Sequence, residues 1–255
     1  MYKLYAFDLD GTLAASKSKI SAFMAQLLNQ LLKYAEVCII SGGKFEQFDT
    51  QVLSFLDPKA NLKALHIMPT CGTQYYKWAG KNNSLNFTQI YAKNLSLDEV
   101  NRSIEALEEQ AKKLHLWETH TWGDKIENRG SQITFSALGQ LAPVEVKEQW
   151  DPNNLKKDKL REAVARQLPD LEVRSGGSTS VDITRKGIDK AYGMRKLKQI
   201  THIDFSEMVF YGDRLDKNGN DYPVKKLGIN TVAVVNPDDT ITKIHQEIEN
   251  LTILN

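Results

Sequence analysis

Short apolar runs alternate with helical periodicity along the first part of the chain. The runs that end at Phe7, Ile40 and Met68 have the length and apolar content of buried strands. Helices are predicted between them from apolar residues at helical spacing: Ile20, Phe23, Leu27 and Leu31 after Ser18 or Ser21 as N-cap, and then Phe45, Phe48 and Leu53. This strand-helix alternation predicts a parallel sheet, and Tyr75–Trp78 adds a hairpin strand.

The pattern changes from about Leu85. A strand near 87–91 precedes a long helix whose start is marked by Ser96 and Glu99 at capping-box spacing. Three more strands are predicted at 132–138, 171–174 and 179–184, with a helix opened by Asn153 among them. Strands and helices that do not alternate regularly indicate an α+β lobe, here an antiparallel sheet backed by two helices.

The strand-helix alternation of the first part of the chain returns near Asp189. A helix to about Leu197 is followed by a strand at 208–211 and a polar loop at 212–221. A short helix up to residue 227, a strand at 231–235 and a last helix at 241–250 are predicted after the loop. The fold class predicted is therefore α/β, a Rossmann-like parallel-sheet core with an inserted α+β domain. We place the core at 1–84 and 185–255, the inserted domain at 85–184, and linkers near 81–85 and 184–187.

Composition narrows the class of protein. The 255 residues carry a net charge of +1 from 33 basic and 32 acidic residues, so no nucleic-acid or membrane partner is indicated. Without an apolar leader or a long apolar run, a cytoplasmic location is expected. The two cysteines, Cys38 and Cys71, lack the spacing of a zinc site or a disulfide framework.

Three polar clusters stand directly after predicted strands. They are Asp8 with Asp10, then Ser41-Gly42-Gly43, and lastly Gly212-Asp213 with Asp216, Asn220 and Asp221. In open parallel sheets ligands bind outside the carboxyl ends of the strands, so the three clusters are predicted to converge there. The turn at Gly11 can bend the chain so that both early acids reach one ion. The alternative for this segment alone is an ordinary Asp-Gly turn capped by Thr12.

Carboxylates beside a hydroxyl, a glycine pair and a lysine suit a phosphoryl group held with Mg²⁺. One carboxylate is placed to attack phosphorus and form an aspartyl-phosphate, and a second acid to move protons to and from the oxygens involved. The contrasting hypothesis is a binding module that keeps the fold without the chemistry.

These residues resemble the motifs of the haloacid dehalogenase superfamily of aspartate-nucleophile phosphotransferases. The four motifs are Asp8-x-Asp10-Gly11-Thr12, Ser41 after a strand, Lys190 opening a helix, and Gly212-Asp213 with Asn220-Asp221. The resemblance implies Asp8 as nucleophile and Asp10 as acid/base. It also implies that Ser41 and Lys190 hold phosphoryl oxygens, and that Asp8, Asp10 through its backbone carbonyl, Asp213 and Asp221 form the Mg²⁺ site.

Within that superfamily the chain is most similar to the eukaryotic-type phosphomannomutases, which have a type IIB α+β cap. The segments that carry the similarity run from Glu127 to Gly139 and from Gly176 to Lys190. The resemblance implies a phosphorylated sugar as substrate and a homodimer through the cap. The substrate-binding residues predicted are Thr12, Gly42, Arg129, Gln140, Lys147, Ser180, Asp182 and Asn220.

Two positions depart from that family. Gln140 and Lys147 stand where the family has cap arginines, and neither side chain gives bidentate, always-charged phosphate recognition. A mutase must hold a bisphosphate while it reorients, whereas a phosphatase needs only to admit water. The sequence therefore favours hydrolysis of a hexose phosphate, with phosphomannomutase, which interconverts mannose 6-phosphate and mannose 1-phosphate, as the alternative.

Overall fold

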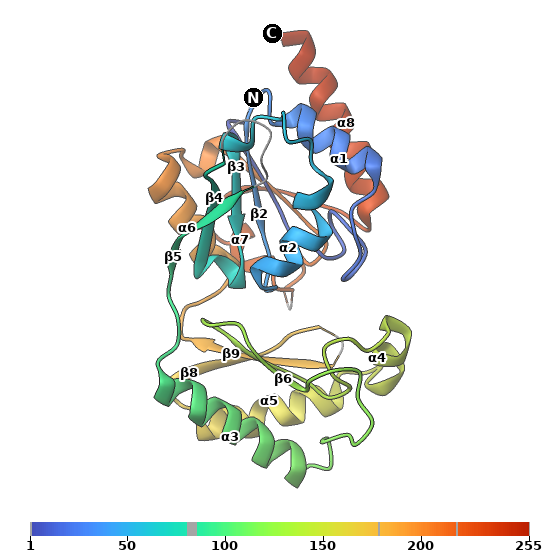
Figure 1. The fold of residues 1–255 in the computed structure, drawn as a ribbon, viewed down its shortest axis with the longest axis vertical. Helices are drawn as coiled ribbons and strands as arrows, with labels where there is room; N and C mark the ends of the chain where they lie inside the picture. Colours follow the sequence, from blue (N-terminus) through green and yellow to red (C-terminus); the bar gives the residue numbers. More distant parts are fainter. Residues whose placement is uncertain (1, 81–85, 178, 218, 255) are drawn as a thin grey trace. The chain divides into compact units, whose positions relative to one another are not determined.

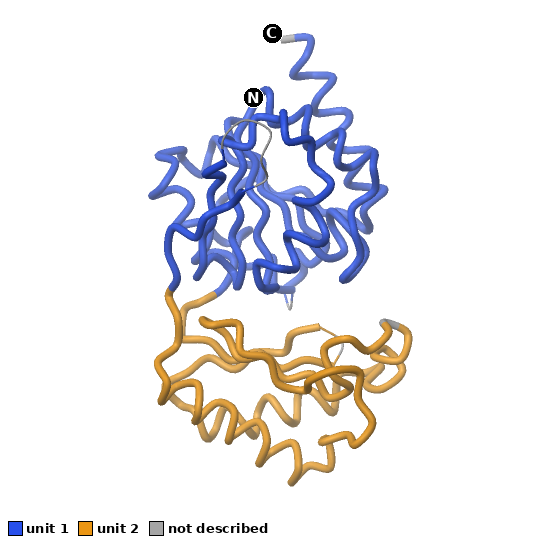
Figure 2. The backbone as a smooth tube through the Cα atoms, in the orientation of Figure 1, with its two compact units in different colours: residues 1–92, 189–255 blue, residues 93–188 orange. Residues whose placement is uncertain are grey.

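The structure, a computed structural model, describes residues 2–80, 86–177, 179–217 and 219–254. The chain forms two compact units: a core unit of residues 1–92 and 189–255, and an inserted unit of residues 93–188 (Figure 2). The chain passes between the units after residue 92 and again after residue 188. The sequence placed these boundaries after residues 84 and 184. The predicted linker at 81–85 lies outside the described residues, and Thr184 and Arg185 belong to a strand of the inserted unit.

A seven-stranded sheet in the order β11-β10-β1-β2-β3-β4-β5 forms the centre of the core unit. Its strands are β1 (Leu4–Phe7), β2 (Glu36–Ile40), β3 (Leu65–Met68), β4 (Gln74–Trp78), β5 (Phe87–Ala92), β10 (Met208–Gly212) and β11 (Asn230–Ala233). β1 pairs in parallel with β2 on one side and with β10 on the other, and the pairs β2–β3 and β10–β11 are also parallel. β4 and β5 extend the sheet in antiparallel orientation. The predicted parallel core is confirmed.

Helices cover both faces of this sheet (Figure 1). Tyr5 and Phe7 of β1 pack with α1 (Ala22–Leu31), α2 (Phe45–Gln51) and α8 (Pro237–Leu254). Leu4 and Ala6 face the other way and pack with α6 (Lys190–Thr201) and α7 (Tyr222–Lys225), as the two-residue period of a strand requires. Burial on both faces explains why the strand reads as a continuous apolar run. No helix in the described ranges has the length and apolar content needed to cross a bilayer.

The inserted unit is a four-stranded antiparallel sheet in the order β6-β7-β9-β8. Its strands are β6 (Ile126–Asn128), β7 (Ile133–Ser136), β8 (Leu171–Ser175) and β9 (Ser180–Arg185). Its core is formed by side chains of one sheet face, among them Phe135 and Ile183, packed with Leu107 of α3 (Leu97–Lys113) and Leu160 of α5 (Leu155–Gln167). The predicted antiparallel sheet backed by two helices is confirmed, and a short helix α4 (Val144–Trp150) and β6 are additional elements.

Two local predictions are corrected. The strand near 87–91 belongs to the core sheet, because β5 pairs with β4 over its whole length and the Tyr91 hydroxyl donates to the Gly72 carbonyl at 2.8 Å. The helix expected to open at Asn153 begins at Leu155. There the Asp151 carboxylate accepts from the N–H groups of Lys156 and Lys157, at 3.1 and 2.9 Å, so Asp151 satisfies more of the helix start than Asn153 does.

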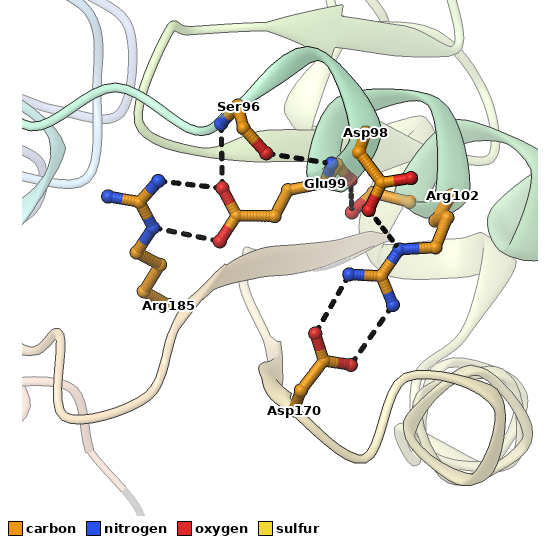
Figure 3. A network of polar contacts seen from close by, with 7 residues as sticks. Ser96, Asp98, Glu99, Arg102, Asp170 and Arg185 are labelled. Carbon is orange, nitrogen blue, oxygen red and sulfur yellow. Dashed lines mark hydrogen bonds and ion pairs between the residues drawn. The ribbon is translucent and has the colours of Figure 1, made fainter.

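The start of α3 is held by a polar network (Figure 3). Ser96 Oγ accepts from the Glu99 N–H at 3.2 Å and the Ser96 N–H donates to Glu99 Oε2 at 2.6 Å, which confirms the capping box. Arg185, the last residue of β9, donates to both Glu99 oxygens, at 2.8 and 2.7 Å. Arg102 joins Asp98 to both oxygens of Asp170. The Glu99 carboxylate thus ties the first turn of α3 to the end of the sheet.

The Glu99 contacts predict a pH dependence of stability. Hydrogen bonding from Arg185, followed by that from Ser96, lowers the pKa of Glu99 to about 2. Because the folded pKa lies below the unfolded value of about 4.3, the stabilisation is complete above that pH and is lost as the pH falls toward 2. Glu99→Gln should cost about 0.5–1 kcal/mol at pH 7 and flatten this part of the profile. Calorimetry of the whole protein from pH 7 to 2 measures both.

The matched control is Glu108→Gln, whose exposed carboxylate pairs with Lys112 along the same helix. A Glu99→Gln profile that stays parallel to the wild-type profile down to pH 2 would rule out this contribution of Glu99.

Candidate functional site

The three polar clusters follow strands that are neighbours in the core sheet. Phe7 of β1 lies opposite Ile39 of β2 and Tyr211 of β10, and the Asp8 N–H donates to the Tyr211 carbonyl at 3.0 Å. Asp8, Ser41 and Asp213 therefore leave the sheet at one edge, the carboxyl ends of β1, β2 and β10. Strand order reverses beside β1, because the chain runs outward through β2 on one side and through β10 on the other.

Asp8 belongs to a buried group of charges. Its Oδ1 lies 2.5 Å from Lys190 Nζ, which is also 2.5 Å from Asp221 Oδ1. Asp8 is 4% exposed, and Lys190 and Asp221 are fully buried. Lys190 is the first residue of α6, and the Asp189 carboxylate fixes the helix start by accepting from the Tyr192 N–H at 2.8 Å. Carboxylate oxygens of Asp8, Asp213 and Asp221 all lie within 4.8 Å of one another.

This group has the charge and donor chemistry of a divalent cation site. When all three carboxylates are ionised, the one ammonium beside them leaves two negative charges over. Burial, together with the neighbouring carboxylates, raises the pKa of Asp8 to about 8 and also raises the pKa of Asp213. Asp213 Oδ1 is buried without a hydrogen-bond partner among the described residues. Hard oxygen donors, an excess of two charges and an unsatisfied carboxylate oxygen fit Mg²⁺.

Lys190 stays charged in this setting. Burial disfavours its ammonium, but the carboxylates of Asp221 and Asp8 more than offset that effect and raise the pKa of Lys190 above its usual value. The second oxygen of Asp221 accepts from the Arg214 N–H at 3.1 Å, which fixes the loop after β10. The ammonium and the loop together hold two of the three carboxylates in one orientation.

Two glycines make room for these carboxylates. A Cβ at Gly11, whose φ is +84°, would lie 2.6 Å from Asp213 Oδ2. A Cβ at Gly212 would lie 2.4 Å from Asp221 Oδ2. The turn at Gly11 was expected to bring the Asp10 side chain to the ion. In the structure it instead admits the carboxylate of Asp213, which arrives from another strand.

The loop after β2 offers a hydroxyl and open space. Ser41 Oγ accepts from the Gly43 N–H at 3.3 Å, and a Cβ added at Gly42 would meet nothing within 4 Å. Thr70 and Cys71, with φ of 48° and 56°, buttress this loop by donating their N–H groups to the carbonyls of Gly43 and Ser41 at 3.0 and 2.9 Å. Non-glycine residues in this left-handed region are strained and persist where their surroundings fix them.

Asp10 lies apart from the carboxylate group. Its Oδ2 accepts from Gln47 Nε2 at 2.8 Å, and its Oδ1 accepts from the Lys17 N–H at 2.7 Å and from Gln51 Nε2 at 3.3 Å. The Asp10 carboxylate is absent from the group formed by Asp8, Asp213 and Asp221 among the described residues. Sequence reasoning missed both glutamines. Their signal was a pair of amides at i and i+4 directly after the Ser41-Gly42-Gly43 loop.

Two other predicted residues of the core unit differ in accessibility. Thr12 is fully buried, and its Oγ1 has no hydrogen-bond partner among the described residues. Asn220 is exposed and directly precedes the buried Asp221.

The predicted cap residues lie within the inserted unit. The strand register places Thr134 between Glu127 and Asp182. Asp182 Oδ1 accepts from the Thr134 hydroxyl at 2.7 Å, and burial raises the pKa of Asp182. Arg129 Nε donates to Glu127 Oε2 at 2.7 Å. A Cβ at Gly176 would lie 2.7 Å from Asp182 Oδ2 and 3.1 Å from Ser180 Cβ, so this glycine leaves space beside both residues.

The two positions that depart from the family pattern lie together. Gln140 Nε2 is 3.5 Å from the carbonyl oxygens of Lys125 and Thr134, and Lys147 Nζ donates to the Gln140 carbonyl at 3.2 Å. Both side chains make contacts to backbone oxygens of the inserted unit.

Known proteins resemble this chain over nearly its whole length. The sequence model of eukaryotic phosphomannomutase matches residues 24–250. The phosphomannomutase of Encephalitozoon cuniculi is 25% identical over 97% of this chain and 94% of its own. That of Saccharomyces cerevisiae is 26% identical with the same coverage.

Solved structures share the fold at lower identity. A truncated IMP-nucleotidase of Plasmodium falciparum has a TM-score of 0.70 at 18% identity, over 98% of this chain and 71% of its own. A haloacid dehalogenase-like hydrolase of Bacteroides thetaiotaomicron has a TM-score of 0.59 at 17% identity, over 96% and 99%.

A parallel core sheet with an inserted four-stranded antiparallel sheet, and an aspartate group at the ends of β1 and β10, define a haloacid dehalogenase-like protein with a type IIB cap. Because the family model covers most of its residues, the chain belongs to the eukaryotic phosphomannomutase family.

Proposed function

We propose that this protein is a phosphomannomutase that interconverts mannose 6-phosphate and mannose 1-phosphate through an aspartyl-phosphate on Asp8. The observation that carries the proposal is the Asp8 carboxylate, 4% exposed and held by Lys190 beside Asp213 and Asp221. Hydrolysis of a hexose phosphate, which the sequence favoured, becomes the second candidate, because relatives of nearly the same length bear the name phosphomannomutase.

The proposed reaction consists of two phosphoryl transfers. An Asp8 oxygen attacks a phosphorus atom of a hexose bisphosphate, the bond from phosphorus to the sugar oxygen breaks, and Asp10 gives that oxygen its proton. A hexose monophosphate then presents its free hydroxyl, and Asp10 takes the hydroxyl proton. The hydroxyl oxygen attacks the phosphorus of the aspartyl-phosphate, and the bond from phosphorus to the Asp8 oxygen breaks, which frees the Asp8 carboxylate. Ser41 and Lys190 would hold the transferring oxygens, with Thr12, Gly42 and Asn220 around the same group.

Asp8, Asp213 and Asp221, with the Asp10 backbone carbonyl, are the residues that would hold Mg²⁺. When bound, the ion spreads the negative charge of the transferring phosphoryl group. The protein's own part is to keep those carboxylates in place: Lys190 fixes Asp8 and Asp221, and Gly11 admits Asp213.

The sugar and its second phosphate are assigned to the inserted unit. Ser180 and Asp182 would contact sugar hydroxyls, and Arg129 would contribute positive charge for phosphate. The row Glu127, Thr134 and Asp182 supports this, because these polar residues occupy adjacent strands at one register position. A homodimer through this unit follows from the family resemblance.

Hydrolysis is kept as the second candidate because of Gln140 and Lys147. Their contacts to backbone oxygens supply no guanidinium for a second phosphate. A lost charged hydrogen bond is worth about 1.5–3 kcal/mol, or roughly a tenfold to hundredfold weaker hold on a bisphosphate.

The two candidates differ in their product. With Mg²⁺, mannose 1-phosphate and a catalytic amount of hexose bisphosphate, we expect mannose 6-phosphate to form faster than inorganic phosphate. Phosphorus NMR follows both products in one sample. Gln140→Arg should raise the ratio of mutase to phosphatase rate by about tenfold, because a guanidinium gives bidentate phosphate contact.

Glu145→Gln, an exposed change near Lys147, is the matched control and should leave the ratio unchanged. Inorganic phosphate that accumulates faster than mannose 6-phosphate would assign the protein to the second candidate. Absence of both products with every sugar phosphate would refute the aspartyl-phosphate chemistry as well.

A further inference from the structure

The Asp10 carboxylate is held by three N–H donors that come from two segments. The Lys17 backbone and the Gln51 amide donate to Oδ1, at 2.7 and 3.3 Å, and the Gln47 amide donates to Oδ2 at 2.8 Å. Both oxygens are therefore engaged, and the plane of the carboxylate is fixed from two directions. A carboxylate at the end of a short side chain would otherwise rotate about two bonds.

The two amides belong to one face of α2. Gln47 and Gln51 are four residues apart, so their side chains lie one turn apart on the helix. The Gln47 side chain crosses Gly43, where an added Cβ would lie 2.1 Å from its Oε1. Gln47 thus spans from the Ser41-Gly42-Gly43 loop to Asp10. A side chain at position 43 would push this amide out of its present position.

Gln51 also donates to Asp10, although this orientation leaves its own side-chain oxygen without a hydrogen bond among the described residues. It is 3% exposed, and its Nε2 donates both to Asp10 and to the Ser18 carbonyl. Its Oε1 is buried with no hydrogen-bond partner in the described part of the chain. A flipped amide would direct that oxygen at two acceptors, so the carboxylate and the carbonyl enforce the orientation.

We propose that Gln47 and Gln51 are positioning residues that orient the Asp10 carboxylate for proton transfer to and from the sugar oxygen. This inference rests on the proposed function, in which Asp10 is the acid/base. A group that moves a proton must reach it at hydrogen-bond distance, so the rate depends on how often the carboxylate has the right orientation. The amides raise that fraction without touching the substrate.

The consequence is a dependence on the leaving group. When the bond from phosphorus to a sugar oxygen breaks, that oxygen needs the proton from Asp10. When the leaving group is 4-nitrophenolate, the oxygen is stable as an anion and leaves without a proton. Loss of orientation at Asp10 should therefore slow transfer from sugar phosphates and leave transfer from the aryl phosphate nearly unchanged.

The test is single-turnover transfer to Asp8 from a hexose bisphosphate and from 4-nitrophenyl phosphate, in the wild type and in Gln47→Leu. In Gln47→Leu we expect the rate of transfer from the sugar phosphate to fall roughly 10- to 100-fold and the rate from the aryl phosphate to stay within about twofold of wild type. Asp10→Asn should show the same pattern with a larger loss, about 10²–10⁴-fold in the rate from the sugar phosphate. Adding Gln47→Leu to Asp10→Asn should cost nothing further, because the amide acts only through the carboxylate.

Asp49→Asn, an exposed change on the same helix, is the matched control. Gln51→Met serves as a second positioning variant if Gln47→Leu unfolds. Equal losses with both substrates, or additive losses in the double variant, would show that the amides only support the structure and would overturn the proposal.

A crystal structure of Gln47→Leu gives a readout that needs no activity. Asp10 should adopt a different or mixed side-chain conformation there, and an unchanged Asp10 would overturn the proposal. A wild type that transfers no phosphoryl group from either substrate would refute the proposed function, while the conformation of Asp10 in the variant would still decide whether the amides position it.

Discussion

Asp8→Asn is expected to abolish phosphoryl transfer while the protein stays folded. The change removes the nucleophilic charge and keeps the shape of a side chain that is 4% exposed. Loss of a covalent nucleophile costs at least about 10⁴-fold in turnover. The measurement is the Mg²⁺-dependent rate with mannose 1-phosphate and bisphosphate, together with phosphoprotein detection by mass spectrometry after an acid quench.

The variant also tests whether a phosphoryl group forms on Asp8, independently of the turnover rate. Wild-type protein should gain one phosphoryl group on a peptide that contains Asp8, and the variant should gain none. Asp49→Asn, an exposed acid on α2, is the matched control. Turnover of Asp8→Asn within tenfold of wild type would remove Asp8 as nucleophile.

The sequence predicted the edge of the sheet at which the site forms, for a physical reason. Buried parallel strands are apolar on both faces, so a polar residue directly after such a run marks the end of a strand. Asp8, Ser41 and Asp213 each stand at such an end, and their strands are neighbours. Neighbouring parallel strands present their carboxyl ends together, so a position directly after a strand was enough to predict that the three residues leave the sheet at one edge.

The strand pattern could not predict in which direction each side chain points at that edge of the sheet. The two-residue period holds within a strand, and Asp10 lies after β1 has ended. Its direction is decided by donors from α2 and from Lys17, which lie close only once the chain has folded. Likewise, the clearance of Gly11 for Asp213 depends on contact between residues about two hundred positions apart.

The strand β5 shows a different limit. Its residues are all exposed or half-buried, as in many edge strands, and the polar stretch before it resembled a boundary between domains. Pairing with β4 placed it in the core sheet instead. A strand hydrogen-bonds to whichever sheet edge lies beside it in the folded protein, and the pattern of residues within the strand does not identify that edge.

Lys190→Met is expected to destabilise the core unit and to abolish transfer together. Lys190 is fully buried and lies 2.5 Å from both Asp8 and Asp221. Its removal leaves buried carboxylates without their cation, a loss of about 3–5 kcal/mol when one partner of a buried pair is removed. Methionine keeps most of the side-chain volume, so this loss reports on charge more than on packing. Urea unfolding followed by circular dichroism measures it.

The double variant Lys190→Met with Asp221→Asn separates stability from catalysis. Removing both partners of a buried ion pair is often nearly neutral, but Asp8 still lacks its cation here, so the double variant should regain part of the unfolding free energy lost by Lys190→Met. It should regain no transfer, because Asp8 would lack the ammonium and the site would lack a carboxylate. Lys196→Met, a half-buried lysine on the same helix, is the matched control for the chemical change. A double variant as unstable as Lys190→Met would show that neutralising Asp221 is not part of how Lys190 stabilises the core unit.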